Sequence, residues 1–304
     1  MQKSRKPIDI LFAATSDYLP YAIVTARSAI EMAAGRPVNI HFMYADIVRP
    51  IDDVVRAGFF EMARRSFDDV NAQINFYDIS NLIPLLDGQN TGMWGAEVSK
   101  THYFYLLAPM VLPEFVERVI YLDTDMIVNC DLSDAFDIKM GKHLIAMGAP
   151  RGIEEMGDDV SNSGFSVLNL KQWRTENTLN ELLEFGRGLP SSRFCDQYLL
   201  HEYFKKNHID RMMFLGPEYN MFPQCHMDID LKNIKILHYT GYNHYKPWGD
   251  VWGRQRGGYL WWRYARRTEF YEKFIMDMVA GGYMPRRVKT KHHSLWWHLI
   301  RMKF

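Results

Sequence analysis

VIYLDTDMIV, residues Val119 to Val128, is the stretch that decides the expected fold. It opens with four apolar residues, a short β-branched and aromatic run typical of a parallel strand buried on both faces. Two carboxylates follow, and because side chains alternate along an extended backbone, Asp123 and Asp125 are expected on one side, roughly 7 Å apart at their Cα atoms. Open α/β sheets bind ligands at the carboxyl ends of their strands. The stretch therefore predicts a site for a divalent metal with an attached diphosphate.

The Asp-x-Asp triplet alone carries little weight, because the chain holds a second copy, Asp228-Ile229-Asp230. The second copy sits among polar residues, whereas the first follows an apolar strand. The position of the first copy at a strand end favours a metal site. The bare triplet is common in proteins that have no metal site there.

Strand and helix patterns alternate on both sides of this stretch. Strands are expected over residues 8–14, 39–44, 74–79, 144–148, 165–170 and 234–239, and helices over 21–32, 51–65, 99–111, 171–185, 195–206 and 261–279. Such alternation predicts an α/β fold with a parallel sheet. The Gly-rich segment 84–97, which carries Met93 and Trp94, is either a mobile lid with a sugar-contacting aromatic or an ordinary connection.

The composition argues against several classes of protein. The 304 residues suffice for one large α/β domain or two smaller ones. Because 36 basic residues balance 36 acidic ones, the protein has no net positive charge that would suggest a nucleic-acid partner. Three cysteines without Cys-x-x-Cys spacing argue against a disulfide scaffold or a zinc site and favour a reducing compartment. The N-terminal apolar run is short and broken, so we expect neither a signal peptide nor a transmembrane span.

Four stretches in a fixed order give the chain a resemblance to a known family. They are FAATSDY (Phe12 to Tyr18), YLDTDMIV followed by DLSDAFD, SNSGFSVLNLKQWR (Ser161 to Arg174) and HYTGYNHYKPW (His238 to Trp248). Together they resemble the retaining family 8 glycosyltransferases, the class with lipooligosaccharide galactosyltransferases and glycogenin. The resemblance spans about residues 8 to 248. It implies a GT-A-like fold, a mostly parallel sheet flanked by helices, and a UDP-sugar donor.

The same residues suit the chemistry of a nucleoside diphosphate leaving group, whose departure requires a bridging cation and further positive or N–H groups. Asp123, Asp125 and His238 offer two carboxylates and one imidazole, a set that suits Mn²⁺ and also accepts Mg²⁺. An isolated histidine would more often be structural, but the HYTG and KPW context favours a ligand. Lys246 is a candidate point charge on the terminal phosphate, and Gly241 permits close approach of the backbone.

The resemblance implies contacts to each part of a UDP-sugar. These are, in chain order, Ala13, Thr15 and Asp17 around the uracil, Asp123 at the ribose, and Asn162 and Ser163 at ribose, phosphate or donor sugar. The donor would thus bridge the N-terminal stretch, the central strand end and the Ser161 to Arg174 stretch.

Asp196 and Gln197 fall where family members place the pair that faces the transferred sugar. By resemblance, Asp196 would hold the sugar hydroxyls and Gln197 would lie near the anomeric carbon. If the anomeric configuration is retained through double displacement, the enzyme needs a carboxylate nucleophile, which Gln197 cannot be. Either Asp196 is the nucleophile or the acceptor attacks from the leaving-group face. We favour front-face attack, in which the departing phosphate takes the acceptor's proton and no separate base is needed.

Three positions depart from the family pattern. Many members have aspartate at the position of Thr15, arginine at that of Tyr105 and a second aspartate at that of Tyr198. Thr15 can still bond a base edge. Loss of the arginine removes a charged contact worth about 1.5–3 kcal/mol, which implies weaker binding or a different donor sugar. Two extra residues also lengthen the loop between Gly241 and Lys246, which leaves open whether Lys246 reaches the phosphate.

These observations predict a metal-dependent retaining glycosyltransferase that moves a hexose, galactose or glucose, from a UDP-sugar to a glycan or glycolipid acceptor. Assembly of bacterial surface polysaccharide, such as lipopolysaccharide, is the expected setting. We expect a catalytic domain over residues 1–250 and a helical, basic and aromatic appendage over 251–304. The departures above motivate an alternative, a nucleotide-sugar-binding protein without transferase activity. A glycogenin-like self-glucosylating primer lacks support, because no tyrosine stands out as acceptor.

The segment from about Met284 to the last residue is basic and aromatic, and no acidic residue follows Asp277. Its lysines and arginines are Arg286, Arg287, Lys289, Lys291, Arg301 and Lys303, and they are interleaved with apolar residues that include Trp296, Trp297, Leu299, Ile300 and Phe304. Paired tryptophans favour the headgroup region, and each cation near an anionic leaflet adds about 1 kcal/mol. We therefore expect a cytoplasmic protein held peripherally on the inner face of the cell membrane. The alternative is that Trp296 and Trp297 dock on the catalytic domain.

Overall fold

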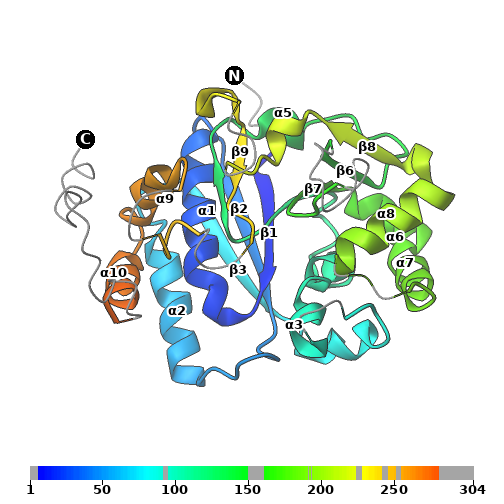
Figure 1. Cartoon of the computed structure of the whole chain (residues 1–304), viewed down its shortest axis with the longest axis horizontal. Helices are drawn as coiled ribbons and strands as arrows, with labels where there is room; N and C mark the ends of the chain where they lie inside the picture. The colour runs from blue at the N-terminus through cyan, green and yellow to red at the C-terminus, as the bar shows by residue number, and fades with distance from the viewer. Residues whose placement is uncertain are drawn as a thin grey trace.

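A seven-stranded sheet with helices on both faces forms the frame of the molecule (Figure 1). The structure is a computed structural model that describes residues 6–91, 95–149, 161–190, 192, 194–223, 228–241, 246–250 and 255–280. Two sequence-based expectations lie outside the described residues. These are the aromatic tip of the 84–97 segment, Met93 and Trp94, and the basic tail from Met284 onward.

The strands and helices follow one another along the chain as the periodicity predicts, with a few exceptions given below. The strands are β1 (Ile8–Ala14), β2 (Val38–Tyr44), β3 (Ala72–Asp78), β4 (Val119–Leu122), β5 (Met126–Val128), β6 (Ile145–Gly148), β7 (Phe165–Leu168), β8 (Met212–Leu215) and β9 (Ile236–His238). The α-helices are α1 (Leu19–Met32), α2 (Asp53–Arg65), α3 (Ala96–Thr101), α4 (Ala108–Val111), α5 (Ser133–Phe136), α6 (Leu170–Glu176), α7 (Thr178–Arg187), α8 (Cys195–Asn207), α9 (Gly258–Ala265) and α10 (Tyr271–Ala280).

The strand order is β3-β2-β1-β4-β7-β6-β8. All neighbours run parallel except β7, which is antiparallel to both β4 and β6. The expectation of a mostly parallel α/β sheet is confirmed. β4 lies in the middle of the sheet with all four residues buried, as a strand covered on both faces requires. Its carboxyl end therefore opens between the ends of β1 and the neighbouring β7.

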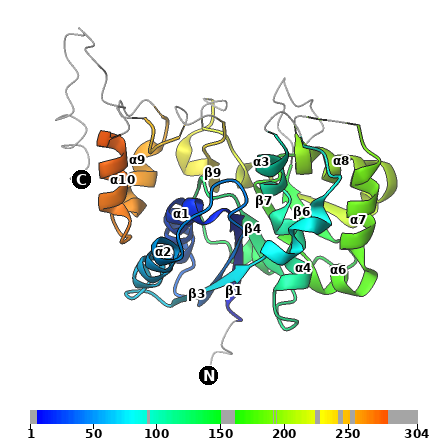
Figure 2. The same cartoon turned by 90° about the horizontal axis from the view of Figure 1, so that it is seen from below.

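Alternation along β1 divides the core into two layers. Ile10 and Phe12 belong to the cluster that also contains buried residues of α1, α9 and α10, whereas Leu11 and Ala13 belong to the cluster with residues of α6, α7 and α8. Figure 2 shows the same division, with α1, α2, α9 and α10 on one side and α4, α6 and α7 on the other. The sheet is thus the middle of three layers.

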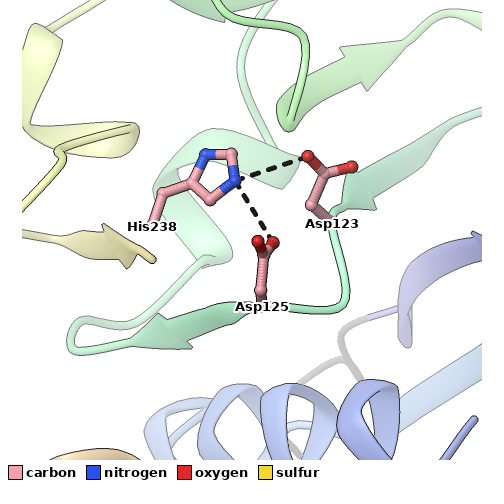
Figure 3. Close-up of side chains that lie close together, drawn as sticks. All are labelled: Asp123, Asp125 and His238. Atoms are coloured by element: carbon pink, nitrogen blue, oxygen red, sulfur yellow. Dashed lines mark ion pairs between the residues drawn. The ribbon is translucent and has the colours of Figure 1, made fainter. Parts of the chain in front are cut away.

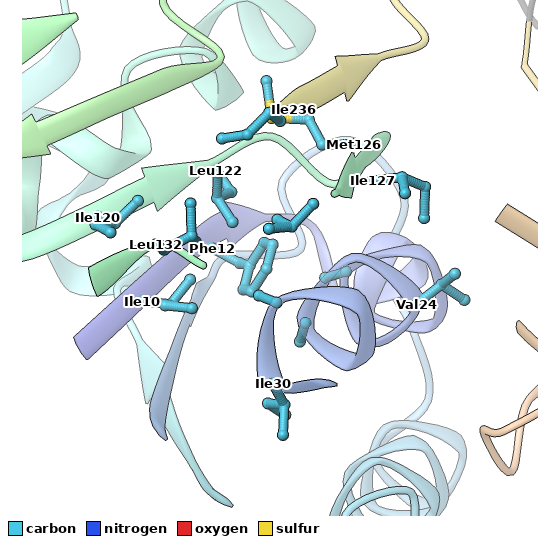
Figure 4. Packing of buried hydrophobic residues seen from close by; sticks show 14 of the residues in the cluster. Ile10, Phe12, Val24, Ile30, Ile120, Leu122, Met126, Ile127, Leu132 and Ile236 are labelled. Carbon is cyan, nitrogen blue, oxygen red and sulfur yellow. The ribbon is translucent and has the colours of Figure 1, made fainter. Parts of the chain in front are cut away.

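A second, two-stranded sheet is formed by β5 and β9. It packs in the core layer that contains Ile10 and Phe12. Figure 4 shows Met126, Ile127 and Ile236 of this small sheet around the ends of β1 and β4. Two hydroxyls of α1 bond its free edge: Thr25 Oγ1 donates to the Met126 carbonyl at 2.8 Å, and Ser28 Oγ accepts from the Val128 N–H at 2.9 Å. The expected strand over 234–239 is therefore present but belongs to this sheet, antiparallel to β5, and not to the edge of the main one.

Three of the expected helices are interrupted. The segment 99–111 is not one helix: α3 ends at Thr101, a 3₁₀ helix covers Phe104–Leu107, and α4 begins at Ala108. Pro109 explains the break, because its ring excludes it from a helix interior but fits the first turn of α4. The expected helix 171–185 splits into α6 and α7 at Asn177, whose φ of 56° is left-handed and ends the first helix.

The expected helix 261–279 is also two helices, α9 and α10. Thr268 separates them, since its hydroxyl and its N–H both donate to the last carbonyl of α9, on Ala265. Trp261 is fully buried against the domain, as expected for the WWRYARR stretch. The division at residue 250 remains a prediction. None of the described helices has the length and apolar character needed to cross a bilayer.

Candidate active site

The two aspartates of the central stretch converge because the chain turns between them. Asp123 follows β4, Thr124 and Asp125 form a turn, and β5 begins at Met126. The Asp123 N–H donates to the Gly164 carbonyl at 2.8 Å, which fixes the end of β4 against the β7 side. The expectation that one extended strand aligns the two carboxylates is therefore wrong, but the turn brings both to one place.

His238 completes this group from the second sheet. In the β5–β9 pairing Met126 lies opposite His238, which sets the imidazole beside the turn. His238 Nε2 lies 3.4 Å from Asp123 Oδ2 and 3.2 Å from Asp125 Oδ1 (Figure 3). One ligand atom from each of the three residues lies within 4.8 Å of the others. We call these three residues the carboxylate–histidine cluster.

The other ring nitrogen of His238 is held by Asn220, a residue that the sequence analysis missed. His238 Nδ1 lies 2.9 Å from Asn220 Oδ1, which can only accept. Nδ1 must therefore carry the proton, and Nε2 turns its lone pair toward the two carboxylates when the ring is neutral. This is the tautomer that a metal-binding histidine needs, with its second nitrogen hydrogen-bonded as is usual for such ligands.

Gly164 permits the close packing of the cluster. A Cβ atom at this position would lie 2.5 Å from His238 Cε1 and 2.6 Å from Asp123 Oδ2, closer than any side chain tolerates. The glycine of the SNSG stretch is therefore required by the approach of the two ligands on either side of it, and no larger residue fits without displacing one of them.

The two carboxylates of the cluster differ in their surroundings. Burial alone would raise the pKa of Asp125, but Lys246, in an ion pair with Asp125 Oδ2, and His238 outweigh it and hold that pKa below its ordinary value. Burial raises the pKa of Asp123, against the opposing charge of His238. Tyr121 donates a hydrogen bond of 2.5 Å to Asp123 Oδ1. Lys246 thus neutralises Asp125 from the side of the longer loop.

The donor set fits a divalent metal ion. Two carboxylates and one neutral imidazole, facing one point, are ligands that Mn²⁺ and Mg²⁺ accept. The ion pair with Lys246 shows in addition that a cation is stable at Asp125.

A line of side-chain amides connects this cluster with Gln197. Asn220 Nδ2 donates to Asn162 Oδ1 at 2.9 Å, and Asn162 Nδ2 donates to Gln197 Oε1 at 2.8 Å. Together with the bond from His238 to Asn220, these contacts link the metal-type ligands to the first turn of α8. The expected residues Asn162 and Gln197 are therefore brought together with the cluster, through Asn220.

Asp196, next to Gln197, is held by neutral hydrogen-bond donors. It is 3% exposed, and its Oδ2 accepts a hydrogen bond of 3.0 Å from the Tyr105 hydroxyl. Ser163 is a second hydrogen-bond partner. Burial raises the pKa of Asp196 to about 6, partly offset by the charge of His102 and by the two hydroxyls. A carboxylate held by hydroxyls in this way is suited to binding further hydroxyls, such as those of a sugar.

A cleft of about 640 Å³ opens beside the cluster. Of the expected donor-binding residues it is lined by Ala13, Thr15, Asp17 and Asp123, together with Asp125. Three parts of its lining were not expected: Tyr18 with Arg49, His102 after α3, and Lys273 and Met278 of α10. The cleft thus joins the N-terminal stretch to the strand end, as the expected donor path requires.

Gly241 and Lys246 flank the loop that is two residues longer than the family pattern. Gly241 has a φ of 96°, a left-handed conformation that favours glycine. Lys246 contacts Asp125, while residues 242–245 between them lie outside the described part of the chain.

Comparisons with known proteins identify the family. The sequence profile of glycosyl transferase family 8 matches residues 9–251, most of the chain. The chain belongs to this family. Glycosyltransferase GlyF of Streptococcus pneumoniae is 26% identical over 84% of this chain and 60% of its own length. Lipopolysaccharide 1,2-glucosyltransferase of Escherichia coli is 23% identical over 79% of this chain and 72% of its own.

A solved structure agrees with the fold. Galactosyltransferase LgtC, in complex with donor and acceptor sugar analogues, superposes with a TM-score of 0.63 at 19% identity and covers 88% of this chain and 100% of its own. The GT-A-like fold expected from the sequence is thereby confirmed. The chain spans only 60% of the length of GlyF and 40% of that of the related GlyB.

The three departures from the family 8 pattern have different surroundings. Tyr105, where many members have arginine, is buried, stacks on Tyr121 with ring centroids 4.1 Å apart, and bonds Asp196. Thr15 donates to Asp17 at 2.5 Å and lines the cleft. Tyr198 is half-buried on α8. At Tyr105 a neutral aromatic pair thus stands where the resemblance implies an arginine in many family members.

Proposed function

We propose that the protein is a metal-dependent retaining glycosyltransferase that moves a hexose from a UDP-sugar to a glycan or glycolipid acceptor. The observation that carries the proposal is the position of the carboxylate–histidine cluster at the end of β4, beside the cleft and linked by amides to Gln197. Family membership and the likeness to the LgtC fold support a transferase of this kind.

Each part of the site has a role in this proposal. Asp123, Asp125 and His238 hold the metal, and Mn²⁺ or Mg²⁺, when bound, supplies positive charge against the diphosphate. Lys246 leaves Asp125 for the terminal phosphate, and Thr15 and Asp17 bind the base. Asn162 and Ser163 contact the ribose, phosphate or sugar. Asp196 binds sugar hydroxyls, because its present partners are hydroxyls already.

Front-face attack fits this arrangement better than double displacement. Asp196 is bonded by the hydroxyls of Tyr105 and Ser163, so it is engaged in holding contacts. Gln197 Oε1 accepts from Asn162 and is no nucleophile. The acceptor hydroxyl would therefore attack from the side of the departing phosphate, which takes its proton.

Release of UDP tests the proposal. Purified protein is incubated with UDP-galactose, UDP-glucose and other UDP-sugars, with Mn²⁺ or with a chelator, and with or without a glycan acceptor. We expect UDP release that requires the metal and increases with acceptor, and a product with retained anomeric configuration. Turnover without any metal dependence would refute the metal site. Tight binding of a UDP-sugar without turnover on any acceptor would favour the alternative, a binding protein without transferase activity.

The acceptor is proposed to be a bacterial surface polysaccharide or glycolipid such as lipopolysaccharide. Support comes from the relative whose name states lipopolysaccharide 1,2-glucosyltransferase. Galactose or glucose is the proposed sugar.

We also propose cytoplasmic, peripheral membrane attachment through the tail from Met284, which would concentrate the enzyme near a lipid-linked acceptor. The support is the tail's composition, basic and aromatic without an acidic residue. Truncation before Met284 should abolish sedimentation with anionic vesicles and spare turnover of a soluble acceptor. If the full-length protein does not sediment with such vesicles at low salt, this role is ruled out.

A further inference from the structure

Few basic groups are among the described residues that line the cleft. Its described basic lining residues are Arg49, His102 and Lys273. Lys273 is paired with Asp277 at 2.5 Å. Arg49 acts on the pKa of Tyr18, whereas His102 acts on the pKa values of Asp123 and Asp196. Of these three, His102 is therefore the basic residue positioned for a ligand group near the carboxylate–histidine cluster.

The backbone fixes His102 at the mouth of the site. It is the residue that ends α3, its N–H is bonded to the carbonyls of Ser99 and Lys100, and its side chain is exposed. Lys100, its basic neighbour, is instead engaged by Asp87 at 2.9 Å and by Glu97. The imidazole is thus the basic group that α3 presents to the cleft.

His102 lies within electrostatic reach of both functional groups of the site. Burial raises the pKa of Asp196, and His102 is the strongest influence that opposes this shift. The same imidazole also acts to lower the pKa of Asp123. His102 therefore lines the cleft with Asp123 and lies close enough to Asp196 to act on its charge. In a UDP-sugar the bond that breaks lies between the diphosphate and the sugar.

Tyr105 supplies no cation to its side of the site. Its hydroxyl is committed to Asp196 and its ring to Tyr121, so it gives the leaving group no positive charge. Developing charge on the terminal phosphate is stabilised by donors placed beside it in advance. Lys246 approaches from one side, through Asp125, and the α3 side is left to His102.

We propose that His102 binds the terminal phosphate of the nucleoside diphosphate, donating a hydrogen bond from its imidazole to an oxygen beside the scissile bond. This rests on the proposed function, which makes a UDP-sugar the ligand. Nothing in the sequence pattern singled out His102, because its role depends on the meeting of α3 with the ends of β4 and α8.

Calorimetric titration of UDP and UMP, each with Mn²⁺, tests the inference on the full chain. For His102→Ala we expect about a tenfold loss of UDP affinity, the size of one charge-assisted contact, and no change for UMP, which lacks the terminal phosphate. His102→Gln keeps an N–H donor and should recover part of the loss. Lys142→Ala, which removes a surface cation paired with Asp210 outside the cleft, is the matched control and should change neither affinity.

The outcomes distinguish a failure of the proposed role of His102 from a failure of the proposed function. Unchanged UDP affinity in His102→Ala, with normal binding by the wild type, would overturn the role of His102 and leave the proposed function intact. An equal loss for UDP and UMP would also overturn it, because the effect would not belong to the terminal phosphate. A wild type that binds no UDP would refute the proposed function and the inference with it. Thermal unfolding confirms that the exposed substitution leaves the fold unchanged.

Discussion

The site holds two kinds of carboxylate, and they are stabilised in opposite ways. Asp125, at the turn after β4, is bonded by Lys246 and His238, and these partners keep its pKa low despite burial. Asp196, at the start of α8, is bonded by the hydroxyls of Tyr105 and Ser163, and burial raises its pKa to about 6. Both side chains are almost fully enclosed.

This difference shows that the neighbours, and not burial, decide what a carboxylate can do. A carboxylate with cationic partners stays ionised at any pH near neutrality and exchanges one cation for another at little cost. A carboxylate with hydroxyl partners is poised between its two protonation states and recognises other hydroxyls. The first environment suits metal and phosphate, and the second suits a sugar.

Removing Asp125 should have the largest effect. Asp125→Asn keeps the shape but loses the charge that a metal and Lys246 share, so Mn²⁺-dependent turnover should fall about a thousandfold or more. Mn²⁺ affinity, measured by titration calorimetry, should fall with it. The control is Asp230→Asn in the second Asp-x-Asp copy, where asparagine can still cap the 3₁₀ helix Leu231–Asn233. Full activity in Asp125→Asn would show that the cluster is not a metal site.

Asp196 should reveal its environment through the pH dependence of stability. Because its folded pKa is raised, the folded state binds this proton more tightly than the unfolded state does. The resulting stability is present below pH about 4 and is lost as pH rises through about 6. Relative to Asp196→Asn, the unfolding free energy of the wild type should therefore fall by on the order of 3 kcal/mol across this window. Urea unfolding of both proteins at several pH values measures it.

A flat difference between the two proteins from pH 4 to 7 would mean that Asp196 is no more costly to ionise than an exposed carboxylate. The contrast with Asp125 would then disappear.

Lys246 tests whether one cation replaces another at Asp125. Lys246→Ala removes the ion pair, so Mn²⁺ affinity without nucleotide should rise several-fold, because the metal no longer displaces a lysine. UDP affinity at saturating Mn²⁺ should fall about tenfold, through loss of a phosphate contact. Both are measured by calorimetry against Lys142→Ala. If UDP affinity does not change, the longer loop keeps Lys246 away from the phosphate.

Tyr105 should give the smallest effect. Tyr105→Phe keeps the stack on Tyr121 but removes one donor to Asp196, at a cost of about 1 kcal/mol in unfolding free energy. It should raise the pKa of Asp196 further and lower turnover. Tyr203→Phe is the matched control, because that hydroxyl also meets a carboxylate, Glu181 at 3.2 Å, outside the cleft. Equal turnover in the two variants would show that the Tyr105 hydroxyl has no part in the site.

The sequence by itself predicted the elements whose signals are local. β1, β2, β4 and β6 lie within one residue of their expected bounds at nearly every end, because short apolar runs between turn residues specify a strand wherever it packs. Local chemistry that was overlooked explains most errors in the helices, since Pro109 and Asn177 are visible in the sequence. β8 was missed although Gly216-Pro217 marks its end, because its four residues, Met-Met-Phe-Leu, show no alternation and include no β-branched residue.

The candidate ligands Asp123, Asp125 and His238 were also found from the sequence, but the reason for their convergence was not. The alternation of a single strand does not bring them together. A turn, a second sheet and the α1 hydroxyls of Thr25 and Ser28 do, and each depends on residues about 100 positions away in the chain.

Only the tertiary structure decided how each charged group is tuned. Asn220 fixes the tautomer of His238, Tyr105 donates a hydrogen bond to Asp196, and His102 acts on the pKa values of Asp123 and Asp196, although these pairs of residues are separated along the sequence. Electrostatic and hydrogen-bond energies depend on distance in space and on the removal of water, and neither is encoded in the spacing of residues along the chain. The sequence determined which chemical groups the strand ends carry, and folding determined which partners those groups meet.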